Sequence, residues 1–177
     1  MAAAKIEMRY GTVEDAPLLA DLGARTFQET FAAENTPQDM AVYLCASFGA
    51  ERQAAELADP KSVFFIAEVG GQAVGYARLH SGAPAEGVTG ERPIELLRIY
   101  ALREWAGRGV GPRLLEACIA EAQARGHDVL WLGVWERNLR AQAFYRKWGF
   151  VEVGQHTFQL GSEPQTDLVM QNQLGLD

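Results

Sequence analysis

Three glycines, Gly107, Gly109 and Gly111, follow an apolar run and precede apolar residues at helical spacing. A helix begins with unpaired backbone amides and the positive end of its dipole, and glycine lets a ligand approach the backbone closely. The arrangement therefore predicts a site for a phosphate or pyrophosphate group. An ordinary strand-to-helix turn can carry the same glycines, so the glycines alone leave both interpretations open.

Other ligand motifs do not fit this chain. A dinucleotide-binding G-x-G-x-x-G motif starting at Gly107 would need glycine at position 112, which is Pro112, and no Gly-Lys is followed by Ser or Thr as a Walker loop requires. The sequence has no H-E-x-x-H run and no EF-hand loop, and His80, His127 and His156 are isolated. We therefore predict no metal ion.

Charge is distributed unevenly along the chain. The 23 acidic and 16 basic residues give a net charge of -7, which argues against a general nucleic-acid binder. Residues 98–147 nevertheless carry nine Lys and Arg against five Asp and Glu. This basic segment fits a small anionic ligand, although ordinary solvated helix faces would show the same balance.

Length and composition predict one soluble domain over residues 1–177. The chain is 48% hydrophobic and 22% charged, which excludes a disordered tail or a disulfide-rich mini-protein. Cys45 and Cys118 form no C-x-x-C pair, so a reduced, cytoplasmic location is expected. The start lacks an apolar signal core, and the longest fully apolar run, residues 63–67, is far too short to span a membrane.

Hydrophobic periodicity predicts the elements that would position the turn. Thr12 and Asp15 are spaced as a capping box, and Gly70-Gly71 is typical of a hairpin turn. Strands are expected at 6–10, 63–69, 73–79, 94–102, 129–134, 150–153, 157–160 and 167–170, and helices at 13–31, 40–48, 50–57, 110–125 and 139–148. Residues 81–93 form a long loop that is either a lid or substrate wall, or simply slack.

Two segments together resemble a known family. The run from Glu95 to Gly111, followed by Asn138 and by Ala-Phe-Tyr-Arg-Lys-Trp-Gly-Phe at 143–150, resembles the GCN5-related N-acetyltransferases (GNAT). The resemblance covers nearly the whole chain and implies an α/β fold: a mostly antiparallel sheet flanked by helices and splayed between its fourth and fifth strands. It implies transfer of an acetyl group from acetyl-coenzyme A to an amine, with no metal.

The resemblance also implies which residues hold acetyl-coenzyme A. The backbone of Ile99, Tyr100 and Ala101 would bind the thioester and the pantetheine arm, and the glycine turn would bind the pyrophosphate. The expected cofactor-binding residues are Ile99, Tyr100, Ala101, Gly107, Arg108, Gly109, Val110, Gly111, Asn138 and Tyr145. Ala106 stands where the family usually has Gln or Arg, which removes one phosphate contact, and Asn138 is either a cofactor ligand or only a helix N-cap.

Two side chains are candidates for proton transfer. Glu95 lies eleven residues before Ala106, where several relatives place a catalytic glutamate, and strand alternation would aim it away from Leu96. It is the expected base, with a solvated carboxylate or a water chain as the alternative. Tyr145 is expected to protonate the departing thiolate, although a core aromatic would have the same spacing. Cys118 lacks a neighbouring base and is not expected to act as a nucleophile.

The acceptor is indicated only by the first helix. Phe27, Glu29 and Phe31 resemble segments that wall the acceptor site of relatives acting on small amines and polyamines, and helix packing explains the two phenylalanines equally well. We predict direct transfer to a primary amine, a small amine or polyamine. The alternatives are a protein N-terminus or lysine, and a non-catalytic module that binds coenzyme A or a partner. No nucleic-acid or membrane partner is expected, and a homodimer is compatible with the sequence.

Overall fold

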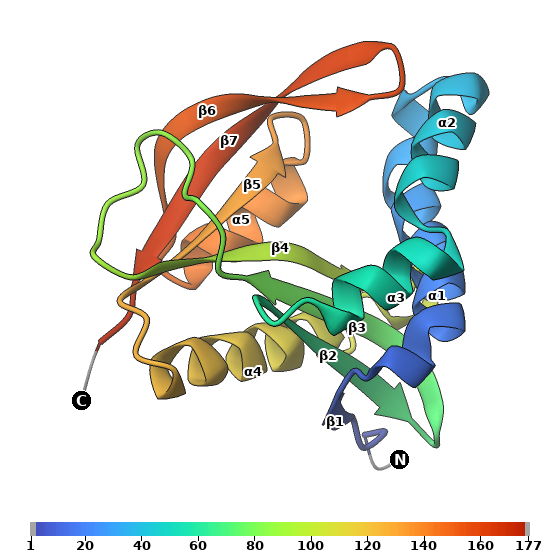
Figure 1. Cartoon of the computed structure of the whole chain (residues 1–177), viewed down its shortest axis with the longest axis horizontal. Coiled ribbons are helices and arrows are strands. Elements are labelled where there is room, and N and C mark those ends of the chain that lie inside the picture. The colour runs from blue at the N-terminus through green and yellow to red at the C-terminus, as the bar shows by residue number, and fades with distance from the viewer. Residues whose placement is uncertain (1–2, 176–177) are drawn as a thin grey trace.

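A mixed sheet carries helices on both of its faces (Figure 1). The computed structural model describes residues 3–175. Its strands are β1 (Glu7–Tyr10), β2 (Ser62–Val69), β3 (Gln72–His80), β4 (Pro93–Ala101), β5 (Val129–Trp135), β6 (Val151–Leu160) and β7 (Glu163–Gln173). Its α-helices are α1 (Ala16–Phe31), α2 (Pro37–Ser47), α3 (Ala50–Ala58), α4 (Val110–Ala124) and α5 (Leu139–Lys147).

The sheet divides between β4 and β5. The strand order is β1-β2-β3-β4-β5-β7-β6, and β4 and β5 run parallel whereas the other neighbours are antiparallel. β4 pairs with β5 only over Pro93–Glu95, opposite Val129–Trp131, and beyond this point the two strands separate (Figure 1). The predicted α/β fold, with a mostly antiparallel sheet splayed between its fourth and fifth strands, is therefore confirmed.

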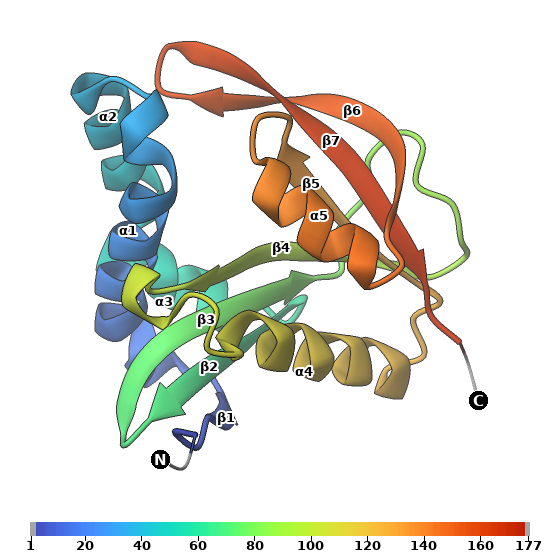
Figure 2. The ribbon, with the colours of Figure 1, turned by 180° about the vertical axis from the view of Figure 1, so that it is seen from behind.

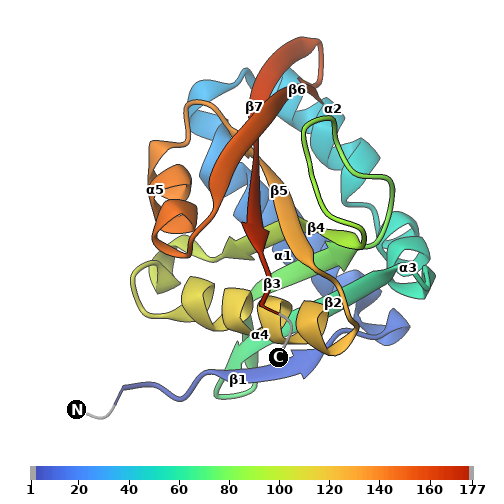
Figure 3. The ribbon, with the colours of Figure 1, turned by 90° about the vertical axis from the view of Figure 1, so that its left-hand side faces the viewer.

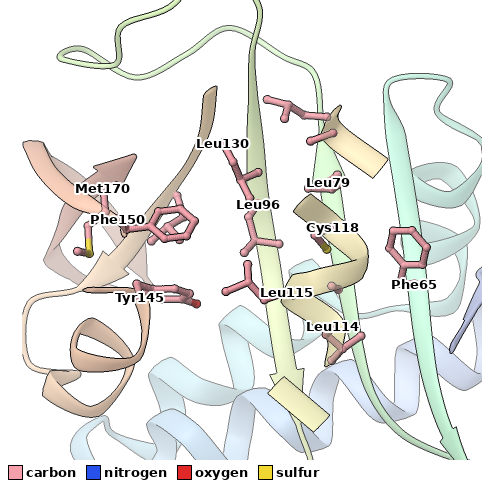
Figure 4. Close-up of a cluster of buried hydrophobic side chains, with 14 of the residues drawn as sticks. Phe65, Leu79, Leu96, Leu114, Leu115, Cys118, Leu130, Tyr145, Phe150 and Met170 are labelled. Atoms are coloured by element: carbon pink, nitrogen blue, oxygen red, sulfur yellow. The ribbon is translucent and has the colours of Figure 1, made fainter. Parts of the chain in front are cut away.

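Helices cover the two faces of β2, β3 and β4 separately. α4 packs against one face and α1 with α3 against the other, as Figures 2 and 3 show. On the α4 face, Leu114, Leu115 and Cys118 are fully buried in the core drawn in Figure 4. On the opposite face, Leu19 of α1 packs against Ile66 of β2. The continuous apolar run in β2 reflects this burial on both sides.

Several predicted boundaries differ from the structure: the strand predicted at 167–170 extends over Glu163–Gln173, and the helix predicted at 40–48 is Pro37–Ser47. Two other differences have a clear physical reason. The first helix begins at Ala16, after a separate 3₁₀ turn at Val13–Asp15, so Pro17 lies in the first turn, where its missing N–H leaves no helical bond unmade. The two short strands expected at 150–153 and 157–160 form one strand, β6, which pairs with β7 through a bulge between Glu152 and Gly154. The bulge absorbs the irregular pattern that suggested a break.

The long loop before β4 covers the sheet away from the β4–β5 separation. The backbone amide of Thr89 donates to Gln171 Oε1 at 2.9 Å, and Ala85 and Val88 pack against Val129, Trp131 and Val169. No residue of 81–92 lines the cavity between β4 and β5, so the loop forms no part of that cavity's wall. Within residues 3–175, every helix is too short or too polar to cross a membrane.

Candidate active site

The separation of β4 from β5 opens a cavity of about 1140 Å³. Residues 95–101 of β4 and 133–135 of β5 form facing parts of its wall. The glycine turn and α5 line one side of it, and α1, α2, α3, β3, β6 and β7 also contribute residues. Most of the residues expected to act in catalysis or binding are therefore brought to one space.

The glycine turn has the conformation expected of an anion site. Gly107 and Gly109 have φ values of 74° and 89°, which side-chain-bearing residues rarely adopt, and Gly109 caps α4. Among the described residues, no acceptor is bonded to the amides of Gly107, Gly109, Val110 or Gly111. Their N–H groups at the helix start are free to bind a pyrophosphate.

The side chains of two residues of the turn do not face the cavity. The amide of Arg108 donates to the carbonyl of Trp105 at 3.2 Å, and its guanidinium lies 5.1 Å from the centre of the Trp105 ring. The side chain of Val110 is 1% exposed and belongs to the core. Neither residue lines the cavity, whereas Gly107, Gly109 and Gly111 do.

The exposed edge of β4 fits an extended amide-bearing chain. Ile99, Tyr100 and Ala101 line the cavity, and β5 does not pair with β4 beyond Glu95. An unpaired strand edge offers a row of backbone donors and acceptors that a pantetheine arm can engage as an added strand. The free amides of the turn and this edge together fit coenzyme A.

Glu95 is a half-buried carboxyl at the point where the two strands separate. Leu96 points into the core on the α4 side, while Glu95 lines the cavity. No hydrogen-bond donor among residues 3–175 contacts its carboxyl group. Burial raises the pKa of Glu95 to about 7, and the charge of Arg78 opposes this only in part. Such a pKa is suited to proton acceptance near neutral pH.

Tyr145 lies on α5 with its ring in the core and its hydroxyl at the cavity. The side chain is 8% exposed and its ring packs against Phe150 at 5.6 Å between centroids. In Figure 4 the hydroxyl points away from Phe150 and Met170. Burial raises the pKa of Tyr145, so the phenol stays protonated at neutral pH, as a proton donor requires.

Asn138 acts as the N-cap of α5. Its side-chain oxygen accepts from the Ala141 amide at 3.2 Å. The residue also lines the cavity, so its amide nitrogen is left to contact a ligand. Capping is therefore observed, and cofactor binding by Asn138 stays a prediction.

The three acceptor residues expected on the first helix all line the cavity. Phe27 and Phe31 are almost completely buried and belong to an aromatic cluster with Tyr43, Phe48 and Trp135. Glu29 is engaged elsewhere, because its carboxylate accepts from the Arg103 amide at 2.8 Å and contacts Arg25 at 3.3 Å. The phenylalanines thus form part of the wall, while Glu29 holds the segment after β4.

Sequence reasoning missed an ion cluster in this wall. Glu56 of α3 contacts Arg98 of β4 at 2.6 Å and Arg78 of β3 at 3.3 Å, and all three side chains are largely buried. Each arginine stands between apolar residues of its strand, which is an available signal, because a charge is rarely buried without a partner. The identity of that partner on α3 could not be read from the sequence.

A second missed pair lies on β6 and β7. His156 Nε2 is 3.5 Å from Asp167 Oδ2, and both residues line the cavity beside Gly133. Burial raises the pKa of Asp167, and the nearby His156 opposes this increase.

Cys118 is fully buried in the core, where burial raises the pKa of its thiol. That position does not favour a nucleophilic role.

Residues 25–150 match the acetyltransferase (GNAT) family. The chain is 32% identical over 161 residues to an uncharacterised N-acetyltransferase of Lactobacillus delbrueckii subsp. lactis, covering 91% of this chain and 93% of that protein. A ribosomal-protein-alanine N-acetyltransferase of Brucella melitensis is 29% identical, with a TM-score of 0.67 over 95% of this chain and 99% of the other. PaiA N-acetyltransferase from Thermoplasma acidophilum, crystallised with coenzyme A, superposes with a TM-score of 0.77 at 20% identity, over 96% and 99% of the two chains. The chain therefore belongs to the GNAT family and is an acetyl-coenzyme A-dependent N-acetyltransferase.

Proposed function

We propose that this enzyme transfers an acetyl group directly from acetyl-coenzyme A to a small primary amine. The observation that carries the proposal is the position of Glu95, a half-buried carboxyl with a pKa raised to about 7 where β4 and β5 separate. Acetyl-coenzyme A supplies an activated acyl group as a thioester. The free amides of the glycine turn and the unpaired edge of β4 support its placement beside Glu95.

Glu95 acts as the base in this proposal. An ammonium has no lone pair, so it must lose a proton before its nitrogen can attack a carbonyl carbon. A carboxylate with an ordinary pKa near 4.5 is too weak a base to take that proton efficiently, and the raised pKa improves the match. Backbone amides of β4 would stabilise the developing negative charge on the carbonyl oxygen.

Tyr145 acts as the proton donor to the leaving sulfur. Its hydroxyl has no hydrogen-bond partner among the described residues, yet it lies at the cavity and not in a sealed pocket. Negative charge develops on the sulfur only as the thiolate departs. A hydrogen-bond donor to that sulfur therefore stabilises the transition state more than the ground state. The aromatic packing of the ring holds the hydroxyl in one place.

The hairpin of β6 and β7 forms part of the cavity wall. The turn between β6 and β7 is tied to α2, because Asp39 Oδ1 accepts from both the amide and the hydroxyl of Ser162 at 2.8 Å. Gln165 also donates to Asn35. Figure 2 shows this hairpin reaching the end of α2 across the molecule. A wall held in place by these contacts favours a small substrate over a folded protein.

A protein N-terminus remains the second candidate acceptor. The Brucella relative, at 29% identity, is named a ribosomal-protein-alanine N-acetyltransferase. An extended N-terminal segment is narrow enough to enter an open strand-lined groove. This acceptor predicts that a short peptide with a free α-amine outperforms every small amine.

The deciding experiment measures thiol release from acetyl-coenzyme A over a panel of acceptors. The panel contains small monoamines, polyamines, amino acids, lysine-containing peptides and peptides with free N-termini, with N-acetylation of each product verified by mass spectrometry. We expect a small amine to give the highest kcat/KM. Tight coenzyme A binding without acceptor-dependent thiol release would show instead a non-catalytic binding module.

A further inference from the structure

Two buried guanidiniums in the cavity wall share one carboxylate. The side chains of Arg78, Arg98 and Glu56 are 8%, 13% and 7% exposed. Arg98 donates to both oxygens of Glu56, at 2.6 and 3.1 Å, and Arg78 Nη1 lies 3.3 Å from Glu56 Oε2. The remaining bonded nitrogens of Arg78 donate to the uncharged hydroxyl of Ser62. This group therefore carries an excess of positive charge.

Within residues 3–175, no other carboxylate near the two arginines fully balances that charge. Arg52, which is 63% exposed, adds a third guanidinium to Glu56 at 3.2 Å. Asp59 acts on Arg78 only at longer range, because its own oxygens accept from the Lys61 amide and contact His80 at 3.2 Å. Glu95 also faces Arg78. A buried charge without a full partner is costly, so the group is suited to receive an anion.

The group and the proposed base share one cavity. Arg98 and Glu95 lie on the same strand, three residues apart, or roughly 10 Å between Cα atoms at an extended rise. Arg78 pairs with Arg98 across β3 and β4, and the guanidinium of Arg98 lies over the Phe48 ring at 5.2 Å. Arg52, Glu56, Arg78, Arg98 and Glu95 all line the cavity. A molecule bound there can reach both the base and the arginines.

Building on the function proposed above, we propose that the acceptor is an aminocarboxylate, whose carboxylate binds Arg78 and Arg98 while its ammonium faces Glu95. A guanidinium presents a planar fork of donors that matches a carboxylate. When Glu95 takes the proton it loses its own charge, and the carboxylate of the acceptor then supplies the negative charge beside Arg78. The aromatic walls of α1 and α2, including Phe27 and Tyr43, fit an apolar body.

The first experiment compares acceptors that differ only in the carboxylate. Phenylalanine, phenylalaninamide and 2-phenylethylamine form one series, and 4-aminobutanoate, 4-aminobutanamide and butylamine form another with a longer spacing. We expect the carboxylate member of at least one series to have the highest kcat/KM, by about tenfold or more, as a charge-assisted pair contributes. Equal or better rates for the amide and amine in both series overturn the proposal.

The second experiment removes one arginine. Arg98→Met leaves Arg78 paired with Glu56, so the buried charges balance and the fold should be retained. We expect the advantage of the carboxylate acceptor to disappear while acetyl-coenzyme A affinity, measured by calorimetry, stays the same. Arg125→Met is the matched control, since Arg125 pairs with Glu121 away from the cavity. An undiminished advantage in Arg98→Met refutes the assignment.

Two further measurements keep the proposal testable. If Arg98→Met does not fold, the substitution Arg52→Met is used instead, because Arg52 is exposed. We expect Arg52→Met to lose part of the preference for the carboxylate acceptor, and an unchanged preference would count against the site. If wild-type enzyme turns over no acceptor in either series, the products N-acetylphenylalanine and N-acetyl-2-phenylethylamine are titrated into the coenzyme A complex. Preferential binding of the carboxylate product supports the site, and equal or absent binding overturns it.

These results separate the anion site from the transferase function. Acetylation of polyamines or peptides without a carboxylate preference would retain the transferase function and remove the arginine site. Absence of acetyl-coenzyme A binding and of thiol release with every acceptor would remove the transferase function itself.

Discussion

The replacement Glu95→Gln tests the proposed base by changing one atom of its side chain. The amide is nearly the same size as the carboxyl but cannot accept a proton. Loss of a general base typically lowers turnover by about 10² to 10⁴-fold. Because Glu95 makes no hydrogen bond to another described residue, acetyl-coenzyme A affinity should be unchanged.

The pKa of Glu95 sets the expected pH dependence. With a pKa of about 7, the carboxylate is ionised in about a tenth of molecules at pH 6 and in about nine-tenths at pH 8. The wild-type kcat/KM should therefore rise about tenfold over this range and then level off. This rising limb should be absent from the residual activity of Glu95→Gln.

The same raised pKa also predicts how stability depends on pH: the folded protein loses stability as the pH rises, whereas its activity increases. In the unfolded chain Glu95 titrates near 4.5, so the folded protein binds more protons between pH 4.5 and about 7 and loses stability as the pH rises through that interval. The full loss above pH 7 is about 3 kcal/mol, since each pH unit is worth about 1.4 kcal/mol. Glu95→Gln should therefore melt several degrees higher than wild type at pH 8 and near the wild-type temperature at pH 4.5.

The assay combines initial rates of thiol release between pH 5.5 and 9 with calorimetric melting at pH 4.5 and 8. Glu116→Gln, an exposed glutamate of α4 outside the cavity, is the control and should match wild type in both. If Glu95→Gln keeps the wild-type rate and the same rise of kcat/KM with pH, the base is water or another residue. A melting temperature lowered at pH 8 would show that Glu95 is a stabilising anchor.

Three further substitutions test the remaining site. Tyr145→Phe keeps the packed ring and removes only a hydroxyl that has no partner among the described residues. Turnover should therefore fall at least about tenfold with little change in Tm, and parallel losses of turnover and Tm would indicate that the hydroxyl is structural. Gly109→Val places a branched residue at a φ of 89° and blocks the approach of a ligand to the turn. Calorimetry should show strongly weakened acetyl-coenzyme A binding by the folded fraction, and unchanged affinity would contradict the pyrophosphate site. Asn138→Ala removes the cap to Ala141 and should cost about 1 kcal/mol of unfolding free energy, while a matching loss of cofactor affinity would add a ligand role.

Local patterns in the sequence were sufficient for the elements around the cofactor. The apolar strand before Gly107, the glycines at positive φ and the N-cap at Asn138 depend on interactions within a few residues, so type and spacing indicate them directly. The resemblance built on the same segments predicted the split sheet, which the pairing of β4 and β5 confirms. Alternation along β4 also indicated correctly that Glu95 faces away from Leu96.

Element boundaries differed from the prediction where non-local pairing decides them. β6 is one long strand because β7 pairs along its whole length and a bulge accommodates Gly154, and neither fact is encoded near residues 153–157. The long loop before β4 had two open interpretations. The loop packs on β5 and β7 and stays out of the cavity wall, through contacts with residues more than 80 positions away.

The chemistry of the acceptor end came from the tertiary structure alone. Glu56, Arg78 and Arg98 meet from one helix and two strands, and the bond between Asp39 and Ser162 joins segments 123 positions apart. The sequence identified Glu95 as a candidate, but its pKa depends on how deeply the separating strands bury it and on the distance to Arg78. Burial and charge proximity are properties of the packed chain, because each depends on atoms contributed by distant segments.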